Sequence, residues 1–108
     1  MARLMIFWNR PQHLTVEEAD AWVREELRRL TGIEGIARAE LTRLTSASER
    51  HGRPHDWMLE LHLAAGAQAS DCLGSQVCAE WLGDLRLLGM RPSVMVADDT
   101  VTLPPRAR

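Results

Sequence analysis

The sequence has no lysine and no tyrosine, and all 13 of its basic residues are arginine. Without lysine the chain cannot form a Schiff base with a carbonyl substrate, and without tyrosine it cannot use a phenol as an acid or a radical site. It also has only two cysteines, Cys72 and Cys78. Their spacing is not that of a CxxC pair and points them to different faces of a helix, so we interpret them as buried free thiols.

Long hydrophobic runs are also missing. No apolar run approaches the roughly 20 residues of a membrane-spanning helix. The apolar stretch near the N-terminus is soon broken by Asn9, Arg10 and Pro11, which makes it too short for a signal peptide. We therefore interpret this stretch as a first strand and expect a cytoplasmic protein.

The chain has no excess of positive charge, since its formal net charge at pH 7 is −2. This balance argues against a large electropositive surface of the kind that binds nucleic acid. A sheet that binds RNA in the manner of RRM domains needs exposed aromatic side chains on its central strands, and only Phe7 could serve there. We predict neither a nucleic-acid partner nor a membrane partner.

What the sequence does contain is typical of a folded domain. The chain has 108 residues, of which 45% are hydrophobic and 26% are charged, and these shares are close to the average of globular chains. This length suits a single domain over residues 1–108 with one modest core. We expect residues 98–108 to form an extension or an untethered tail.

Hydrophobic periodicity predicts two helical regions and four strands. Thr15 and Glu18 form a capping box that starts a helix over about residues 16–31. The second region begins with a short helix, for which Ser70 is the expected N-cap, and continues as a main helix over about residues 75–88. The predicted strands span residues 3–8, 35–46, 55–63 and 93–97.

The order of these elements is β-α-β-β-α-β, which is the ferredoxin-like pattern of an α+β fold. Right-handed crossovers place both helices on one face of a four-stranded antiparallel sheet and leave the other face bare. The stretch HDWMLELHL, residues 55–63, alternates between these two faces. We expect Trp57, Leu59, Leu61 and Leu63 to face the helices, and Met58, Glu60 and His62 to lie on the bare face beside Arg38, Glu40 and Thr42.

Four stretches of the sequence carry a resemblance to a known superfamily. They are IFWNRP, TVEEADAWVREEL, WMLELHL and CLGSQVCAEWLGDLRLLGMRP. Together with the element order, they resemble the dimeric α/β-barrel superfamily, in particular small antibiotic-biosynthesis-monooxygenase and EthD-like proteins. The resemblance implies that two subunits press their bare sheet faces together into a barrel, so that the chain is a homodimer. It also implies a small-molecule cavity between the sheet and the helices of each subunit.

The resemblance also bears on cofactors. Haem-degrading members of the superfamily bind iron through a histidine of the second helix, and residues 70–88 contain no histidine. We therefore expect no haem, and we predict no cofactor. Glu60 and His62 alone supply too few ligands for zinc, so no metal site is predicted.

Four tryptophans fall on faces that we expect to point between the sheet and the helices. They either line a pocket for a flat apolar ligand or fill an ordinary core, and both interpretations stay open. Asn9 closes the first strand, near the place where haem-degrading members have an asparagine, and Arg53 lies in a polar loop where it can hold an anionic substrate. The candidate ligand-binding residues are Trp8, Asn9, Trp22, Trp57, Trp81 and Arg53.

Three histidines are candidate catalytic bases. His62 shares a strand face with Glu60, and a carboxylate beside an imidazole raises its pKa and can orient it for acid–base chemistry. The same pair is typical of an interface or of a solvent-facing ladder of charges, and this is the interpretation that we favour. The candidates are His62, His55 in the polar loop, and His13 near the start of the first crossover.

The first hypothesis is a small-molecule-binding homodimer that acts as a cofactor-independent monooxygenase or isomerase on an aromatic or enolizable substrate. One of the three histidines would then be the base, Trp8 and Trp57 would shape the pocket, and Asn9 or an arginine would hold the oxyanion. The second hypothesis is a non-catalytic ligand-binding or regulatory module of the same fold. The third is a protein whose dimer interface is its only clear feature, and a closed core filled by tryptophan would favour it.

Overall fold

The first strand, β1 (Arg3–Trp8), alternates between two faces as predicted. Leu4, Ile6 and Trp8 are fully buried, whereas the side chains between them are half-buried. The computed structural model describes residues 2–30, 32–44, 56–98 and 101–104. The alternation over so short a segment means that one face of the strand meets a core and the other does not.

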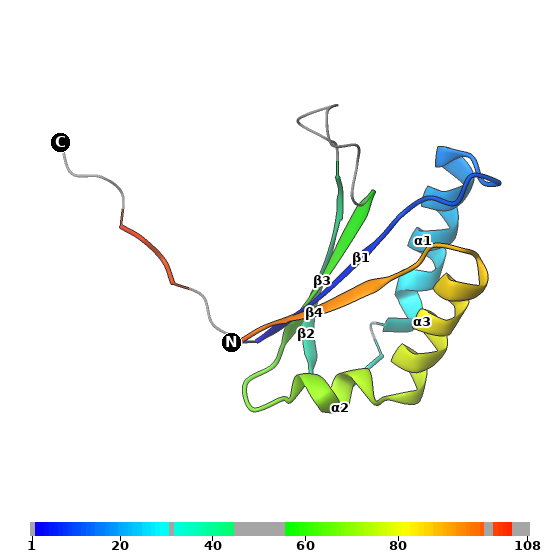
Figure 1. Ribbon diagram of the computed structural model, residues 1–108. Helices are drawn as coiled ribbons and strands as arrows, with labels where there is room; N and C mark the ends of the chain where they lie inside the picture. The colour runs from blue at the N-terminus through cyan, green and yellow to red at the C-terminus, as the bar shows by residue number, and fades with distance from the viewer. Residues whose placement is uncertain (1, 31, 45–55, 99–100, 105–108) are drawn as a thin grey trace.

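β1 lies inside a four-stranded antiparallel sheet (Figure 1). Its neighbours are β3 (Trp57–Leu63) on one side and β4 (Ser93–Ala97) on the other, and β2 (Ile36–Arg43) forms the edge beside β3. The resulting order, β2-β3-β1-β4, is the one that a β-α-β-β-α-β chain produces. The predicted α+β architecture is therefore confirmed.

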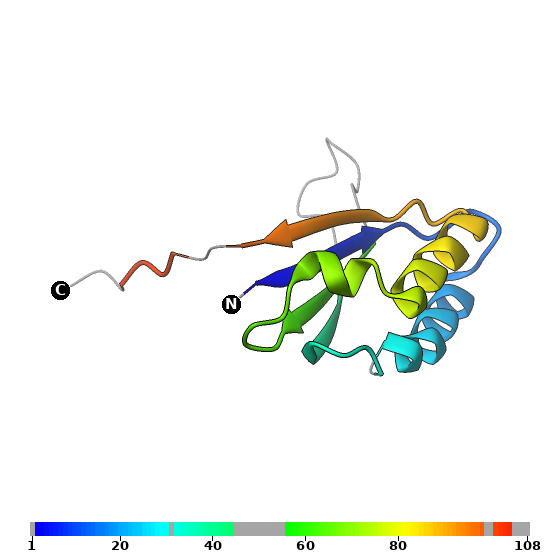
Figure 2. The ribbon, with the colours of Figure 1, turned by 90° about the horizontal axis from the view of Figure 1, so that it is seen from below.

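The helices cover one face of this sheet and leave the other face bare (Figures 1 and 2). α1 (Val16–Leu30) follows β1, whereas α2 (Ala69–Leu73) and α3 (Gln76–Leu87) follow β3. The second helical region is thus divided into a short and a longer helix, as the sequence predicts. Within the described residues, no helix combines the length and apolar character needed to cross a membrane.

The predicted capping box at the start of α1 is confirmed. The Glu18 N–H donates to Thr15 Oγ1 at 3.1 Å, and the Thr15 N–H donates to Glu18 Oε1 at 3.0 Å. The backbone hydrogen bond from Thr15 lowers the pKa of Glu18, because it stabilises the charged carboxylate. Two residues therefore satisfy two otherwise unpaired N–H groups at this end of the helix.

The predicted N-cap at Ser70 is wrong. α2 already begins one residue earlier, after Gln68, which makes no side-chain hydrogen bond as its cap. Ser75 is the cap that operates, at the start of α3: its Oγ accepts from the Cys78 N–H at 3.2 Å and donates to the Cys72 carbonyl at 2.8 Å. The longer helix thus has a side-chain cap, and the five-residue helix before it does not.

These two serines allow a matched test of capping. Ser75→Ala is expected to lower the free energy of unfolding by about 1 kcal/mol, because it leaves an N–H of α3 without an acceptor. Ser70→Ala is expected to change it by less than about 0.5 kcal/mol, because the Ser70 side chain is exposed. Urea unfolding of the two variants measures the difference, and equal losses would contradict the assignment of the cap.

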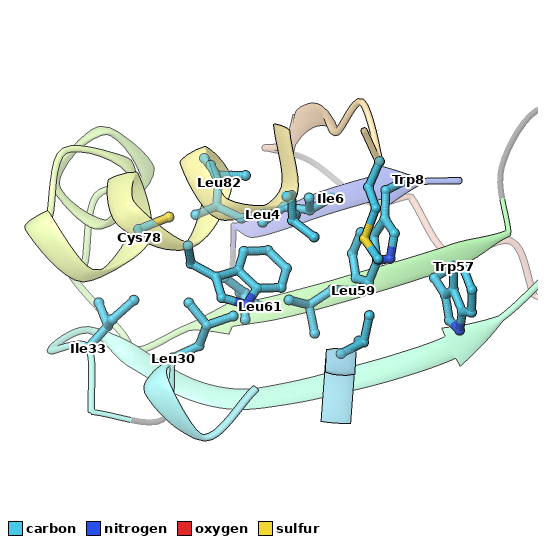
Figure 3. Close-up of a cluster of buried hydrophobic side chains, with 14 of the residues drawn as sticks. Leu4, Ile6, Trp8, Leu30, Ile33, Trp57, Leu59, Leu61, Cys78 and Leu82 are labelled. Carbon is cyan, nitrogen blue, oxygen red and sulfur yellow. The ribbon is translucent and has the colours of Figure 1, made fainter. Parts of the chain in front are cut away.

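The core lies between the sheet and the helices (Figure 3). Its largest side chains are three tryptophans, and the rest are mostly leucines from β1, β3, α1 and α3. No charged or polar residue in the described part of the chain is fully buried. Besides the tryptophans, the fully buried large side chains are Leu4, Ile6, Val23, Leu30, Leu59, Leu61, Leu63, Leu85 and Met90.

A β-bulge at the start of β2 sets which side chains share a face. Ile36 pairs with Leu63 and Arg38 pairs with His62, so Ala37 is an extra residue in β2. The bulge interrupts the alternation of β2 between Ile36 and Arg38. Beyond the bulge, the faces of β2 are those that the sequence predicts.

Candidate functional site

The bare sheet face carries side chains from all four strands. The register pairs His62 with Arg38 and with Arg3, and pairs Met5 with Glu60 and with Met95. Directly paired residues of antiparallel strands point to the same side of a sheet. The predicted placement is confirmed, and the face comprises Arg3, Met5, Phe7, Arg38, Glu40, Thr42, Met58, Glu60, His62, Ser93, Met95 and Ala97.

The charged groups of this face pair with one another, both between strands and along β2. His62 Nε2 lies 2.7 Å from Glu40 Oε1, and Arg38 Nη2 lies 3.1 Å from the same oxygen. Glu60, which we expected to accompany His62, binds Arg3 instead, with 2.7 Å between Oε2 and Nη1. In the register of the sheet, Glu40 lies diagonally across from His62, and Glu60 lies diagonally across from Arg3. Diagonal neighbours on one face are within reach of long side chains, so each carboxylate also has a partner on an adjacent strand.

The tryptophan cluster, Trp8, Trp57 and Trp81, lies on the opposite side of the sheet (Figure 3). Trp8 and Trp57 stack with ring centroids 6.4 Å apart, and Trp81 meets Trp8 edge-on at 5.5 Å. All three are at most 2% exposed, while Trp22 is half-buried and packs against the core. The cluster is therefore a closed and well-packed part of the core.

The indole N–H groups of this cluster are buried donors without hydrogen-bond acceptors among the described residues. A buried donor left without an acceptor typically costs about 1–3 kcal/mol, and most buried polar groups are paired. The cluster thus combines tight aromatic packing with unused hydrogen-bonding capacity.

The structure does not bring the predicted base and the predicted ligand-binding tryptophans together. His62 lies on the bare sheet face, and the sheet separates it from Trp8 and Trp57. His13 is exposed in the connection between β1 and α1. Asn9 is half-buried, and its N–H donates to the Met90 carbonyl at 3.1 Å, which ties the end of β1 to the segment before β4. The other two predicted site residues, His55 and Arg53, lie outside the described residues.

A large open pocket lies at the end of the sheet where β2 begins and β3 ends. Its volume is about 810 Å³. Four short segments line it: residues 32–35, residues 64–68, Asp71 with Cys72, and residues 75–77. We call it the glycine–alanine pocket, because six of its lining residues are glycine or alanine: Gly32, Gly35, Ala64, Ala65, Gly66 and Ala67.

Glycine at position 35 is required by the fold of this pocket. Its φ of +92° is rarely adopted by residues with a side chain, and a Cβ there would lie 3.1 Å from Ala67 Cβ and 3.4 Å from Cys72 Sγ. The Ala64 N–H donates to the Gly35 carbonyl at 2.7 Å. The start of β2 and the loop after β3 therefore approach each other closely at the floor of the pocket.

Comparisons with known proteins bear on the fold. No protein-family model and no curated protein matches the sequence. An EthD (ethyl tert-butyl ether) family protein from Bacillus halodurans superposes with a TM-score of 0.72 at 14% identity, over 93% of this chain and 99% of the other. A dimeric ferredoxin-like protein of unknown function from Thermobifida fusca gives 0.65 at 8% identity, over 89% and 88%. A candidate antibiotic biosynthesis monooxygenase from Deinococcus radiodurans gives 0.62 at 9% identity, over 99% and 100%.

The chain has the ferredoxin-like fold of these proteins. The superposition covers nearly the whole chain and includes structures of the two groups that the sequence resembles. At this level of identity the likeness concerns the path of the backbone, because one fold supports many chemistries. The function therefore depends on the side chains of this particular ferredoxin-like chain.

The thiols of this ferredoxin-like chain are not poised as nucleophiles. Burial raises the pKa of Cys72, and the nearby charge of Asp71 raises it further. Burial likewise raises the pKa of Cys78. Cys72 Sγ lies 3.8 Å from the Glu34 carbonyl oxygen, to which it donates. Both cysteines are therefore neutral thiols at pH 7, and the expectation of buried free thiols is confirmed.

A smaller recess of about 220 Å³ lies at the opposite end of β3. Arg10, Val16, Arg43, Asp56 and Trp57 line it, so one tryptophan of the cluster reaches its wall. The Arg10 N–H donates to Asp56 Oδ2 at 2.7 Å. This recess therefore brings charged groups beside Trp57.

None of the site residues predicted from the sequence lines the glycine–alanine pocket. The available signal was the stretch AAGA at residues 64–67, together with Gly32 and Gly35. Small side chains at neighbouring turns leave space that larger ones would fill. That signal becomes specific only when the fold shows that the two turns are neighbours.

Proposed function

We propose that this chain binds a small organic molecule in the glycine–alanine pocket. The observation that carries the proposal is the pocket itself, an open space of about 810 Å³ walled by small side chains. Pockets that bind small molecules typically measure about 300–1,000 Å³ and offer apolar walls with a few polar groups. Here Ile33 and Val77 provide apolar surface, and Gln68 and Gln76 provide amides.

Binding without catalysis is the function that this geometry supports best. The lining contains no histidine and no arginine, and the Cys72 thiol has a raised pKa. The acidic side chains of the lining, Glu34 and Asp71, belong to exposed residues. This is the non-catalytic ligand-binding module, the second of the three hypotheses from the sequence.

A second candidate is a cofactor-independent monooxygenase or isomerase that acts at the tryptophan cluster. The three indole N–H groups without an acceptor favour it, because a flat substrate with carbonyl oxygens would satisfy them. A substrate would have to enter through the recess beside Trp57, where Asp56 is the acid–base group among the described lining residues. His62 lies on the other side of the sheet, so it does not face a substrate held at the tryptophan cluster.

We further propose that the chain forms a homodimer through the bare sheet face. The face mixes methionine and phenylalanine with charged side chains that are already paired with one another. Met95 on this face is 55% exposed in the monomer. The Thermobifida fusca protein of the same fold is dimeric, which supports the proposal by analogy of fold. The cytoplasmic location expected from the sequence stays a prediction.

The binding site can be tested with a fragment library and two-dimensional amide NMR. We expect fragments that bind to shift the resonances of residues 32–35 and 64–68, and to leave those around Trp8 and Trp57 unchanged. Shifts concentrated at the tryptophans would favour the second candidate instead. A complete absence of shifts at both places would contradict small-molecule binding.

A pocket-filling variant sharpens this test. Gly32→Leu is expected to weaken binding of any such fragment by about tenfold or more, because the new side chain occupies the space of the ligand. A Cβ at Gly32 meets no atom within 4 Å, and the same is true of Gly83 in α3, which does not line the pocket. Gly83→Leu is therefore the matched control and is expected to keep full affinity. If both variants bind the fragment with the same affinity, the ligand does not bind in the glycine–alanine pocket.

A further inference from the structure

We infer that the ligand of the glycine–alanine pocket is a small organic cation, such as a primary amine with a short apolar skeleton. This inference rests on the proposed function, since it names the chemical class that the same pocket would accept.

The lining carries negative charge only. Of its 14 residues, Glu34 and Asp71 are acidic and none is basic. None of the arginines that the structure describes lines the pocket. A concave surface with charges of one sign attracts ligands of the opposite sign, so an anionic ligand would be repelled here and a cationic one favoured.

The helix ends beside the pocket do not change this balance. The N-terminus of α3 contributes partial positive charge at residues 75–77, and the C-terminus of α1 contributes partial negative charge just before Gly32. These two contributions oppose each other. Moreover, the first turn of α3 is already capped, since Ser75 Oγ accepts from the Cys78 N–H. The two carboxylates therefore decide the sign of the local potential.

The two arginines in the last turn of α1, Arg28 and Arg29, do not line the pocket and pair with other carboxylates. Arg28 Nη1 lies 4.0 Å from Glu25 Oε1. Arg29 Nη1 lies 2.6 Å from Glu26 Oε2 and 2.6 Å from Asp84 Oδ2. The hydrogen bonds to Asp84 and Glu26 raise the pKa of Arg29. This double pairing fixes the guanidinium between α1 and α3, on residues that do not line the pocket.

The donor set favours an organic cation over a metal ion. Among the described residues, no three side chains of histidine, cysteine, aspartate or glutamate lie close enough together to hold a metal. An exposed carboxylate of the lining, that of Glu34 or of Asp71, can pair with an ammonium group, whose three N–H donors can also bind amide and backbone oxygens. Ile33, Ala67 and Val77 would then contact the carbon skeleton of the ligand.

Three molecules of similar shape and different charge test this inference: 2-phenylethylamine, 2-phenylethanol and 3-phenylpropanoate. Binding to the full chain is measured by isothermal titration and by amide shifts of residues 32–35 and 64–68. We expect the amine to bind about tenfold more tightly than the carboxylate, with the alcohol between them. The preference is expected to shrink as salt is added, because exposed charges are screened.

Charge-neutralising variants identify the carboxylates responsible. Glu34→Gln with Asp71→Asn is expected to abolish the preference for the amine and to leave the affinity for the alcohol unchanged. The matched control is Glu25→Gln, which removes an exposed carboxylate of α1 outside the pocket and is expected to keep the preference. The alcohol also reports whether the doubly substituted pocket is still folded.

The outcomes separate the two proposals. Equal binding of all three probes at the pocket would overturn the cationic ligand and leave small-molecule binding standing. Preference for the carboxylate would do the same. If no probe shifts the pocket resonances and no library fragment does so either, both proposals fail.

Discussion

Replacing Trp81 with alanine is expected to lower the free energy of unfolding by about 3–5 kcal/mol, the usual cost of removing a large buried aromatic side chain. Trp81 is fully buried and meets Trp8 edge-on at 5.5 Å, so alanine would leave a cavity at the centre of the core. Small domains have a total stability of about 5–15 kcal/mol, so this one change would remove a large part of it. Urea unfolding followed by circular dichroism measures the loss.

The half-buried Trp22 provides the matched control for this prediction. Trp22→Ala removes the same side chain from the edge of the core and is expected to have a clearly smaller effect, because less apolar area returns to water. If both variants lower the free energy of unfolding by the same amount, the burial of Trp81 does not account for its contribution to stability.

A phenylalanine at position 81 separates packing from hydrogen bonding. Trp81→Phe keeps most of the aromatic contact and removes the N–H that has no acceptor among the described residues. The loss of volume and the relief of the unpaired donor then oppose each other, so the net change is expected to stay below about 1.5 kcal/mol. A loss as large as that of the alanine variant would mean that the indole N–H makes an essential hydrogen bond.

Replacing Met5 with aspartate is expected to convert the proposed homodimer into a monomer. Met5 lies on β1, inside the bare sheet face, between its paired residues Glu60 and Met95. A carboxylate buried there without a partner costs about 3 kcal/mol or more, which raises the dissociation constant over a hundredfold. Light scattering measures the mass, which is expected to fall from twice the chain mass of 12.2 kDa to that mass.

Two further variants distinguish loss of the dimer from unfolding and from a general effect of added charge. Met95→Asp changes a residue that is already 55% exposed, so the monomer should tolerate it even if Met5→Asp unfolds. Leu87→Asp places the same charge on α3, where Leu87 is 87% exposed, and is expected to leave the dimer intact. A wild-type chain that is monomeric at micromolar concentrations would contradict the proposed interface.

Much of the fold follows from local sequence patterns. The alternation in β1 and β3 identifies the buried face of each strand, because side chains of a strand alternate with a period of two. Thr15 and Glu18 mark the start of α1, because their hydrogen bonds form within a single turn. These features involve residues close in sequence, so their physical causes are visible without the tertiary structure.

The cap of the second helical region shows where such local patterns reach their limit. Ser70 and Ser75 are both good candidates by residue type. Ser75 caps a 12-residue helix, whereas Ser70 lies inside a five-residue one. The choice depends on where the backbone bends around Gly74, and that bend is set by how α2 and α3 contact each other and the sheet rather than by the serines themselves.

What the sequence alone determined about this protein is the order of its elements, the faces of its central strands and the resulting ferredoxin-like fold, because period and capping act over a few residues. Only the tertiary structure decided which groups meet. It pairs His62 with Glu40 across strands rather than with Glu60 beside it, and it builds a pocket from residues 32–35 and 64–68. These contacts join segments far apart in the chain, so they depend on strand register and on the bulge at Ala37, which no local pattern encodes.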